Sequence, residues 1–449
     1  MRRLLNAAAI VGLTTVCSPA FADDDLSAIR AEIDAMRVEY QSRINDLETR
    51  LAEAEARTAR AETSAQSAQR AVEAMPAAVR VPPPAAPVAR PAQTGANAFN
   101  PAISGVLNGQ FAASSADPDL AALPGFDLDA EAGRPARGFN LGESEIVIAA
   151  NIDPTLYGNL TFSLGQDGSV GVEEAYIQTT SLGGGLTLRG GRMFSGIGYL
   201  NEVHAHAWAF SDQALPYRAF LGGQYGDDGV QLRWIAPVDQ YLEFGAEIYR
   251  GDAFPAGGGA NGGTGTSAVW ARTGGDIGSG SSWLASASLL DANAQSRDVN
   301  GSEFTGDETL GILSLVYKWA PGGNRRDRNL TLSGEYFVDT MRGNFDAVPV
   351  NLDRSGWYVQ GIYQFRRRWG AGLRYAALTP DNVPFGLAGS ALDAAGLNPW
   401  TATALLEFDT SEFGRLRAQY TRDESDRVAN DEFLLQYTVT YGPHAAHRF

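Results

Sequence analysis

The chain has 449 residues, a formal net charge of −17 and an aromatic content of 10%. Such an acidic surface argues against nucleic acid as a partner, because both surfaces would carry negative charge. Beyond the first 22 residues, no stretch approaches the roughly 18 to 20 apolar residues that a membrane helix requires.

Residues 1–22 have the features of a secretory signal peptide. Arg2 and Arg3 precede an apolar run, and Ala20-Phe21-Ala22 forms a small-x-small cleavage pattern. The single cysteine, Cys17, lies within this segment. A lipoprotein site at Cys17 is disfavoured, because Val16 occupies the position where such sites have a small residue. The mature chain would therefore contain no disulfide and no cysteine metal site.

Residues 23–75 have the pattern of a periplasmic coiled coil. From Leu26 to Leu51, apolar residues recur three or four positions apart, and charged residues occupy the other positions. A single helix this polar would be marginal in water, so we expect it to pack against copies of itself. The alternative is a solvated or partly frayed helix.

Residues 76–100 form a linker rich in proline and alanine, with six prolines between Pro76 and Pro91. Proline at this density favours an extended, semi-rigid spacer. The linker would hold the coiled coil away from the membrane. Contact between the coiled coil and the cell wall is compatible with this arrangement, although no residue pattern indicates it.

In residues 101–449, apolar and polar residues alternate in about sixteen stretches, which places one face of each strand against an apolar medium. We expect strands near 102–113, 143–152, 154–165, 171–181, 184–194, 227–236, 239–250, 265–275, 280–290, 308–320, 328–340, 355–366, 369–378, 400–410, 413–423 and 431–441. The connections between them are alternately long and short. The pattern predicts an all-β fold, a transmembrane antiparallel β-barrel of about 16 strands.

An even number of strands brings both ends of the barrel domain to the periplasmic side. The last strand leads to Phe449, which resembles the terminal aromatic residue recognised by outer-membrane barrel assembly machinery. A soluble β-sandwich would also alternate, but it does not require alternating loop lengths. We therefore expect the protein in the outer membrane of a Gram-negative bacterium, in contact with lipid and lipopolysaccharide.

The longest connection, residues 195–226, is the candidate pore constriction. In sixteen-stranded porins the loop at this place folds into the lumen, so the resemblance implies that this loop narrows the channel. It combines aromatic residues, which would pack against the wall, with polar residues that would face the solute. The candidate constriction residues are Glu202, His204, His206, Asp212 and Arg218.

His204 and His206 lie two residues apart, so their rings would project the same way from an extended segment. Two neutral imidazoles on one face would share a divalent transition metal, with Glu202 or Asp212 as a third ligand. The alternative is a polar loop whose histidines bond to the backbone or to water. Apart from transient Zn²⁺ or another divalent cation, we expect no cofactor.

Strand parity also assigns charged residues to the inner wall. The expected lumen acids are Glu145, Glu174, Glu243, Glu247, Glu335, Asp339, Glu407 and Asp409. The arginines gather on the twelfth to fifteenth strands, as Arg366, Arg374, Arg415 and Arg417. Facing the loop acids, they would create a transverse field across the constriction. The alternative is that they only solvate the wall.

The order of signal peptide, coiled coil, proline linker and barrel resembles proteobacterial porins of the phosphate-selective type. Those porins attract anions with arginine and lysine arrays, whereas Lys318 is the only lysine here. Separately, residues 204–208 and 221–229 are similar to a stretch in short outer-membrane proteins labelled zinc-regulated receptors, which implies a role for zinc. Energy-coupled receptors have about 22 strands and a plug, more than residues 101–449 can form.

We therefore predict a homotrimeric, water-filled porin for passive diffusion of small hydrophilic solutes or ions, with zinc or another divalent cation as a further solute. One alternative is an anion-selective porin. Another is an adhesin-like structural protein in which the barrel anchors the coiled coil. We do not expect an enzyme, because no catalytic signature accompanies the loop histidines.

Overall fold

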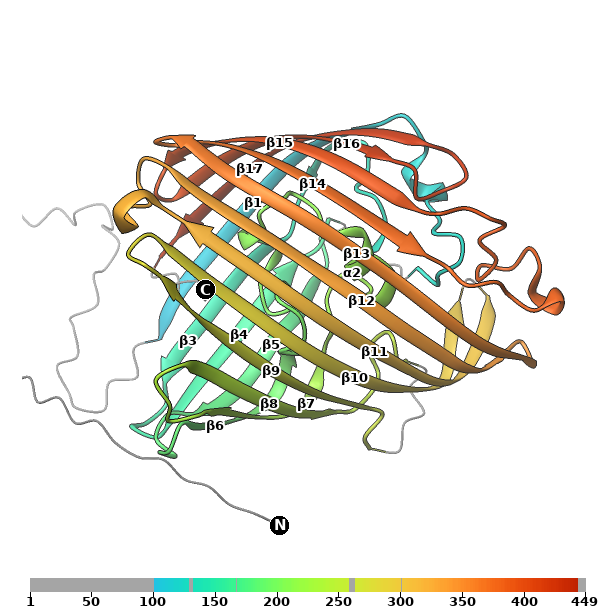
Figure 1. The fold of residues 1–449 in the computed structure, drawn as a ribbon, viewed down its shortest axis with the longest axis horizontal. Coiled ribbons are helices and arrows are strands. Elements are labelled where there is room, and N and C mark those ends of the chain that lie inside the picture. Colours follow the sequence, from blue (N-terminus) through green and yellow to red (C-terminus); the bar gives the residue numbers. More distant parts are fainter. Residues whose placement is uncertain (1–100, 129–131, 167, 258–262, 300, 443–449) are drawn as a thin grey trace, which may run out of the picture. The chain divides into compact units, whose positions relative to one another are not determined.

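The computed structural model describes residues 101–128, 132–166, 168–257, 263–299 and 301–442. The predicted signal peptide, coiled coil and linker lie outside these residues, as does Phe449. The described part is a closed antiparallel β-barrel (Figure 1). In these ranges, no helix has the length and apolar character needed to cross a membrane.

The wall is built from β1 (Ala102–Ser114), β2 (Gly138–Leu141), β3 (Ser144–Asn151), β4 (Leu156–Leu164), β5 (Val170–Thr179), β6 (Leu186–Phe194), β7 (Gly226–Ile235), β8 (Tyr241–Tyr249), β9 (Thr266–Ile277), β10 (Ser281–Val299), β11 (Ser302–Trp319), β12 (Asn329–Phe345), β13 (Val348–Arg366), β14 (Trp369–Thr379), β15 (Trp400–Ser411), β16 (Gly414–Asp423) and β17 (Asn430–Tyr441). Short helices are η2 (Pro118–Leu120), η4 (Ala205–Ala207), α2 (Leu215–Leu221), η5 (Pro321–Gly323) and η6 (Phe385–Leu387).

The seventeen strands occupy sixteen positions in the wall. β2 and β3 pair with successive parts of the same edge of β1, so together they take one position. β17 pairs with the other edge of β1 and closes the barrel. The predicted fold class and the predicted strand number are therefore confirmed.

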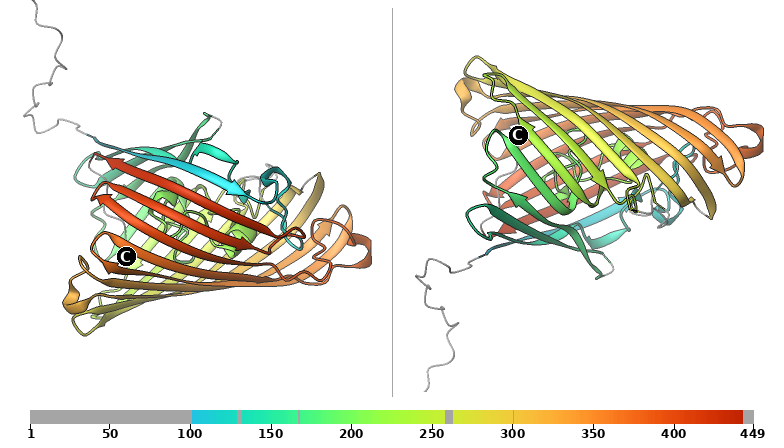
Figure 2. Two further views of the ribbon diagram at one scale, coloured as in Figure 1. Left: turned by 90° about the horizontal axis from the view of Figure 1, so that it is seen from above. Right: turned by 90° about the horizontal axis from the view of Figure 1, so that it is seen from below.

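All sixteen predicted strands are present, but four of them are longer than expected. β10 to β13 contain 19, 18, 17 and 19 residues, and Figure 2 shows them extending beyond the rest of the wall. Their extensions are rich in polar residues, so apolar alternation alone ended the predicted strands too early. Apolar side chains among them, including Phe304 and Phe345, form a separate cluster with residues of the 380–399 loop.

The alternation places polar residues inside the barrel and apolar residues outside. On β7, Val230 and Leu232 are exposed on the outer face, whereas Gln231 and Arg233 are buried inside. On β14, Leu373 is 71% exposed while Arg374 is 5% exposed. Closure of the wall satisfies the hydrogen bonds of the strand backbones. The apolar side chains on its outer face are compatible with hydrocarbon.

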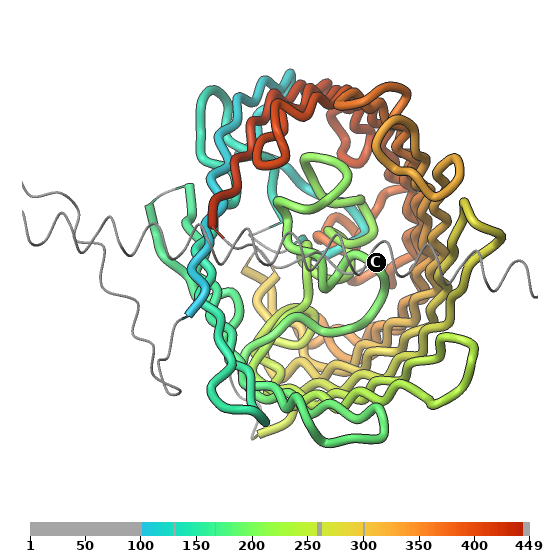
Figure 3. Tube along the Cα trace, turned by 90° about the vertical axis from the view of Figure 1, so that its left-hand side faces the viewer, coloured from blue at the N-terminus to red at the C-terminus, as the bar shows by residue number. Residues whose placement is uncertain are grey.

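The interior contains two folded loops. Figure 3 shows the segment between β6 and β7, in green, within the ring of the wall. We call residues 195–225 the constriction loop; it includes η4 and α2. The first long loop (115–128 and 132–137) contributes Leu123 and Phe126 to the same buried cluster as the constriction loop.

Candidate pore constriction

The start of the constriction loop is held by Glu247 on β8. The carboxylate accepts hydrogen bonds from the backbone N–H of Gly196 at 2.8 Å and from the hydroxyl of Ser195. Gln231 Nε2 and Trp270 Nε1 donate to the same carboxylate at 2.6 Å and 3.0 Å. Two loop donors and two wall donors thus share one buried acid, which fixes where the loop enters the lumen.

Asn201 joins the two ends of the constriction loop. Its side-chain nitrogen donates to the carbonyl oxygens of Ser195 and Tyr225, both at 2.8 Å. Its side-chain oxygen accepts from the backbone N–H of Tyr225 at 2.7 Å. Asn201 is fully buried, so the loss of these bonds would leave unpaired polar groups in the interior.

A second wall acid, Glu335 on β12, holds the middle of the loop. It accepts hydrogen bonds from the backbone N–H of Tyr199 at 2.7 Å and the hydroxyl of Tyr217 at 2.7 Å. Ser314 and Tyr358 of the wall donate to it at 2.5 Å and 2.6 Å. Burial and the Glu335 charge raise the pKa of Tyr199 to about 12, so this phenol stays neutral.

The helix α2 presses an apolar face against the wall. Pro216 is the second residue of its first turn, and Gly222 caps its C-terminal end in the left-handed conformation at φ 63°. Phe220 stacks on Phe337 of β12 at 6.0 Å between ring centroids and meets Phe126 edge-on at 5.4 Å. Each fully buried aromatic side chain contributes about 1.5–3 kcal/mol. This packing fills one part of the lumen with apolar side chains.

Two cavities lie on either side of the segment His204–Trp208. The larger, about 750 Å³, is lined by residues near the short turns, such as Gln178 and Asp276, and extends to His204 and His206. The smaller, about 390 Å³, is lined by residues of the long-loop side and extends to Ala205 and Trp208. The segment therefore separates two spaces inside the barrel, each lined in part by charged side chains.

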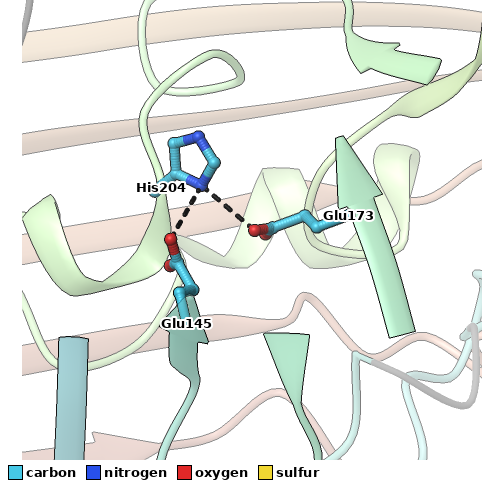
Figure 4. A group of neighbouring side chains, drawn as sticks. All are labelled: Glu145, Glu173 and His204. Atoms are coloured by element: carbon cyan, nitrogen blue, oxygen red, sulfur yellow. Dashed lines mark hydrogen bonds and ion pairs between the residues drawn. The ribbon is translucent and has the colours of Figure 1, made fainter. Parts of the chain in front are cut away.

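Two histidines and three glutamates meet at this segment, and we call Glu145, Glu173, Glu174, His204 and His206 the His–Glu cluster. His204 Nδ1 lies 3.1 Å from Glu173 Oε2 and 3.4 Å from Glu145 Oε2 (Figure 4). His204 Nε2 lies 3.2 Å from Glu174 Oε2, and His206 Nδ1 lies 2.7 Å from Glu145 Oε1. Both imidazole rings therefore contact carboxylates from β3 or β5.

Opposing effects act on the pKa of His204. Burial lowers it, but hydrogen bonds to Glu173 and Glu174 and the charge of Glu145 raise it well above its ordinary value. Acids of the wall thus favour a cation at this point of the lumen. The side chain of Glu145 is fully buried and that of His204 is 20% exposed, so the charges interact with little screening by water.

The structure groups neither of the predicted third metal ligands with His204. Glu202 pairs with Arg233 and with Arg272, the latter at 2.8 Å, and Asp212 pairs with Arg374 at 2.7 Å. Spacing along the loop could not reveal that wall arginines would bind both acids. The carboxylates that do gather with His204 are Glu145 and Glu173.

The loop conformation at the histidine pair also differs from the prediction. His206 lies within the short helix η4, not in an extended segment. The two rings nevertheless lie close together, stacked with 5.8 Å between centroids and 29° between planes. Glu173, which groups with His204 and Glu145, was also not foreseen. It faces inward because β4 and β5 change register at Thr161–Phe162, which leaves Glu173 without a cross-strand partner. Such a bulge turns two consecutive side chains to one side, which strict parity could not foresee.

Three of the predicted wall arginines bind the constriction loop. Arg415 Nη2 donates to the carbonyl oxygen of His206 at 2.5 Å, and Arg417 Nη1 donates to that of Trp208 at 2.8 Å. Arg374 also bonds to the carbonyl oxygen of Asp212 at 2.8 Å. Arg415 and Arg417 therefore hold the segment that separates the two cavities, and Arg374 holds the loop just beyond it.

The remaining predicted residues lie apart from the His–Glu cluster. Arg218 lines the smaller cavity, and its Nε donates to the carbonyl oxygen of Ala132 at 3.0 Å. Arg366 is exposed near the turn between β13 and β14. Glu407 is half-buried beside Arg417 across the β15–β16 pair.

Comparison with known proteins supports the architecture. No family model matches the chain. A loop-deletion variant of OmpT of Vibrio cholerae has a TM-score of 0.50 and 13% identity, covering 77% of this chain and 100% of that one. The anion-selective porin of Comamonas acidovorans has a TM-score of 0.50 and 9% identity, covering 76% and 99%. These likenesses show the barrel fold of outer-membrane porins.

One curated sequence is similar enough to define a family. An uncharacterized protein of Aquifex aeolicus (strain VF5) is 30% identical over 345 residues, which cover 70% of this chain and 70% of that protein. The chain therefore belongs to the same protein family as this Aquifex aeolicus protein.

Proposed function

We propose that the protein is an outer-membrane channel through which small hydrophilic solutes or ions diffuse passively. The observation that carries this proposal is the pair of cavities, about 750 Å³ and 390 Å³, on the two sides of the segment His204–Trp208, each lined in part by charged side chains. A closed wall with an apolar outside supports insertion into a lipid bilayer. The cavities inside it would provide the water-filled path.

The constriction loop would make the path selective. Its packing against Glu247, Glu335 and Phe337 excludes large solutes from a lumen that a barrel of this size would otherwise leave open. Glu145 and Glu174 of the His–Glu cluster line the larger cavity beside His204. Acids grouped at this point of the path would favour cations over anions, so we prefer cation passage to the alternative of an anion-selective porin.

Entry of zinc or another divalent cation is the second part of the proposal. It is supported by the grouping of His204 with Glu145 and Glu173 beside the larger cavity. Assembly as a homotrimer, with a periplasmic coiled coil formed by residues 23–75, completes the proposed organisation.

Planar bilayer recordings of the purified full-length protein test the channel. We expect stepwise increases in current, and grouped steps of three would support a trimer. In a salt gradient, the reversal potential should indicate cation preference, which Glu145→Gln should reduce and Glu303→Gln, at an exposed hairpin residue, should leave unchanged. Absence of current at every voltage from correctly folded protein would refute the channel.

A further inference from the structure

We infer that the His–Glu cluster is a binding site for one divalent transition-metal ion of the zinc type, ligated by Glu145, Glu173 and His204. This inference rests on the proposed channel function and names the class of ion that its constriction binds. It differs from the pattern expected from the loop sequence, in which both histidines would be ligands. Here one loop histidine combines with two acids of the wall.

The donor atoms are spaced as ligands of a single ion would be. Zinc lies about 2.0–2.2 Å from nitrogen and carboxylate oxygen ligands, so two ligands at a tetrahedral angle are about 3.4 Å apart. His204 Nδ1 is 3.1 Å from Glu173 Oε2 and 3.4 Å from Glu145 Oε2. All three donor atoms lie within 4.8 Å of one another. Small side-chain adjustments would therefore bring them around one ion.

The contacts around these three residues leave the correct nitrogen for the metal. Glu174 Oε2 lies 3.2 Å from His204 Nε2 and would accept a hydrogen bond from its N–H, so that Nδ1 is the nitrogen that offers a lone pair to the metal once its own proton has left. Carboxylates commonly orient metal-bound histidines in this way. His206 Nδ1, 2.7 Å from Glu145 Oε1, fixes the orientation of the second ligand. Glu174 and His206 are thus positioning residues.

The donor set favours a transition metal over magnesium or calcium. One imidazole and two carboxylates suit zinc and similar ions, whereas calcium takes 6–8 oxygen ligands and magnesium keeps several waters. Two carboxylates balance the charge of a divalent cation. On binding, the ion would take the Nδ1 lone pair, and the proton held there in the metal-free protein would pass to water.

The site depends on three separate parts of the chain. Glu145 comes from β3, Glu173 from the bulge in β5, and His204 from the constriction loop. Glu145 and His204 both line the larger cavity, which gives the ion a route to the ligands. A bound metal would cross-link the loop to the wall at the point that separates the two cavities.

Isothermal titration of the full-length protein in detergent with Zn²⁺, near neutral pH, tests the site. We expect one tight site per chain that excess Mg²⁺ or Ca²⁺ does not occupy. Glu145→Gln, Glu173→Gln and His204→Ala should each weaken Zn²⁺ binding at least about 100-fold, and Glu174→Gln about tenfold, as for residues that orient a ligand. Glu303→Gln removes an exposed carboxylate and should change nothing.

Two further measurements decide the ligand set and separate this inference from the channel proposal. X-ray absorption of the zinc-loaded protein should show one imidazole; two imidazoles would overturn the assignment of Glu145 and Glu173 with a single histidine. Absence of Zn²⁺ binding by the folded parent, or unchanged binding in both glutamine variants, would also overturn it. The metal-free bilayer current tests the channel alone, so a silent protein that binds Zn²⁺ refutes the channel and retains the site.

Discussion

The hydroxyl of Tyr217 lies 2.7 Å from Glu335 Oε2, and this hydrogen bond joins the constriction loop to the barrel wall. Tyr358, a wall residue, donates to the same oxygen at 2.6 Å. The two tyrosines therefore offer a matched pair, one on the loop and one on the wall, for separating the effect of loop attachment from that of wall stability.

Tyr217→Phe should loosen the constriction loop. The variant loses one buried hydrogen bond, with a cost of about 1–3 kcal/mol, and leaves Glu335 with one donor fewer. We expect a larger and noisier single-channel current. Tyr358→Phe should lower the thermal stability by a similar amount without widening the channel. Equal currents from both variants would show that the Tyr217 bond does not hold the loop.

Loop attachment can also be tested through the backbone at Gly198. Its φ of +62° favours glycine, and an added Cβ would lie 2.6 Å from the Tyr217 hydroxyl and 2.9 Å from Glu335 Oε1. Gly198→Ala should therefore cost about 1–3 kcal/mol. Gly223→Ala, at φ +108° with no atom within 4 Å of the added Cβ, measures the backbone strain alone. A thermal shift no larger for Gly198→Ala than for Gly223→Ala would contradict the crowding argument.

The first long loop should detach in acid. Burial raises the pKa of Asp127, but the charges of Arg297 and Arg354 outweigh it, and the pKa falls below the ordinary value of 3.8. Because the folded pKa is the lower one, the aspartate stabilises the docked loop above pH 3.8, and this contribution is lost as the pH falls through the lowered value.

Hydrogen exchange of residues 115–128 provides the measurement for Asp127. Exchange should accelerate as the pH falls below 3.8 and through the lowered pKa of Asp127. Asp127→Asn should show accelerated exchange already at neutral pH. Asp119→Asn changes an exposed acid in the same loop and serves as the control. Identical protection in the two variants would mean that the arginine pairs do not hold this loop.

The outer face of the wall should reject charge. Leu373, at 71% exposure in the middle of β14, would face hydrocarbon in a bilayer. Leu373→Arg should lower the free energy of unfolding from lipid vesicles by about 2–4 kcal/mol, so the variant is less stable. Val428→Arg, at a 63% exposed position between β16 and β17, should have little effect. Equal urea midpoints for the two variants would argue against a lipid-facing β14.

The barrel could be predicted from the sequence because its signal is repeated and local. Each strand carries its own alternation, so errors at one boundary do not spread to the next. Neighbouring residues such as Val230 and Gln231 indicate which face of the strand is apolar and which is polar. The extensions of β10 to β13 were missed because their residues pair across the strands but are largely polar, so they do not continue the apolar alternation.

The interior was harder to predict because its contacts join residues far apart in the chain. Glu335 meets Tyr199 and Tyr217 across more than 100 residues, and no local pattern encodes such a pairing. The histidine pair was recognised from its spacing. The acids near it could not be predicted, because Glu202 pairs with Arg233 and Asp212 pairs with Arg374. Which acid pairs with which base depends on the folded structure.

Asn201 ties together the residues at which the constriction loop leaves and rejoins the wall. The pairing of β6 with β7 should therefore not depend on the loop sequence between Ser195 and Tyr225. Insertions or deletions within that interval would alter the aperture while the surrounding cylinder keeps its register. Changes confined to the constriction loop would therefore alter the interior of the barrel without changing how β6 pairs with β7.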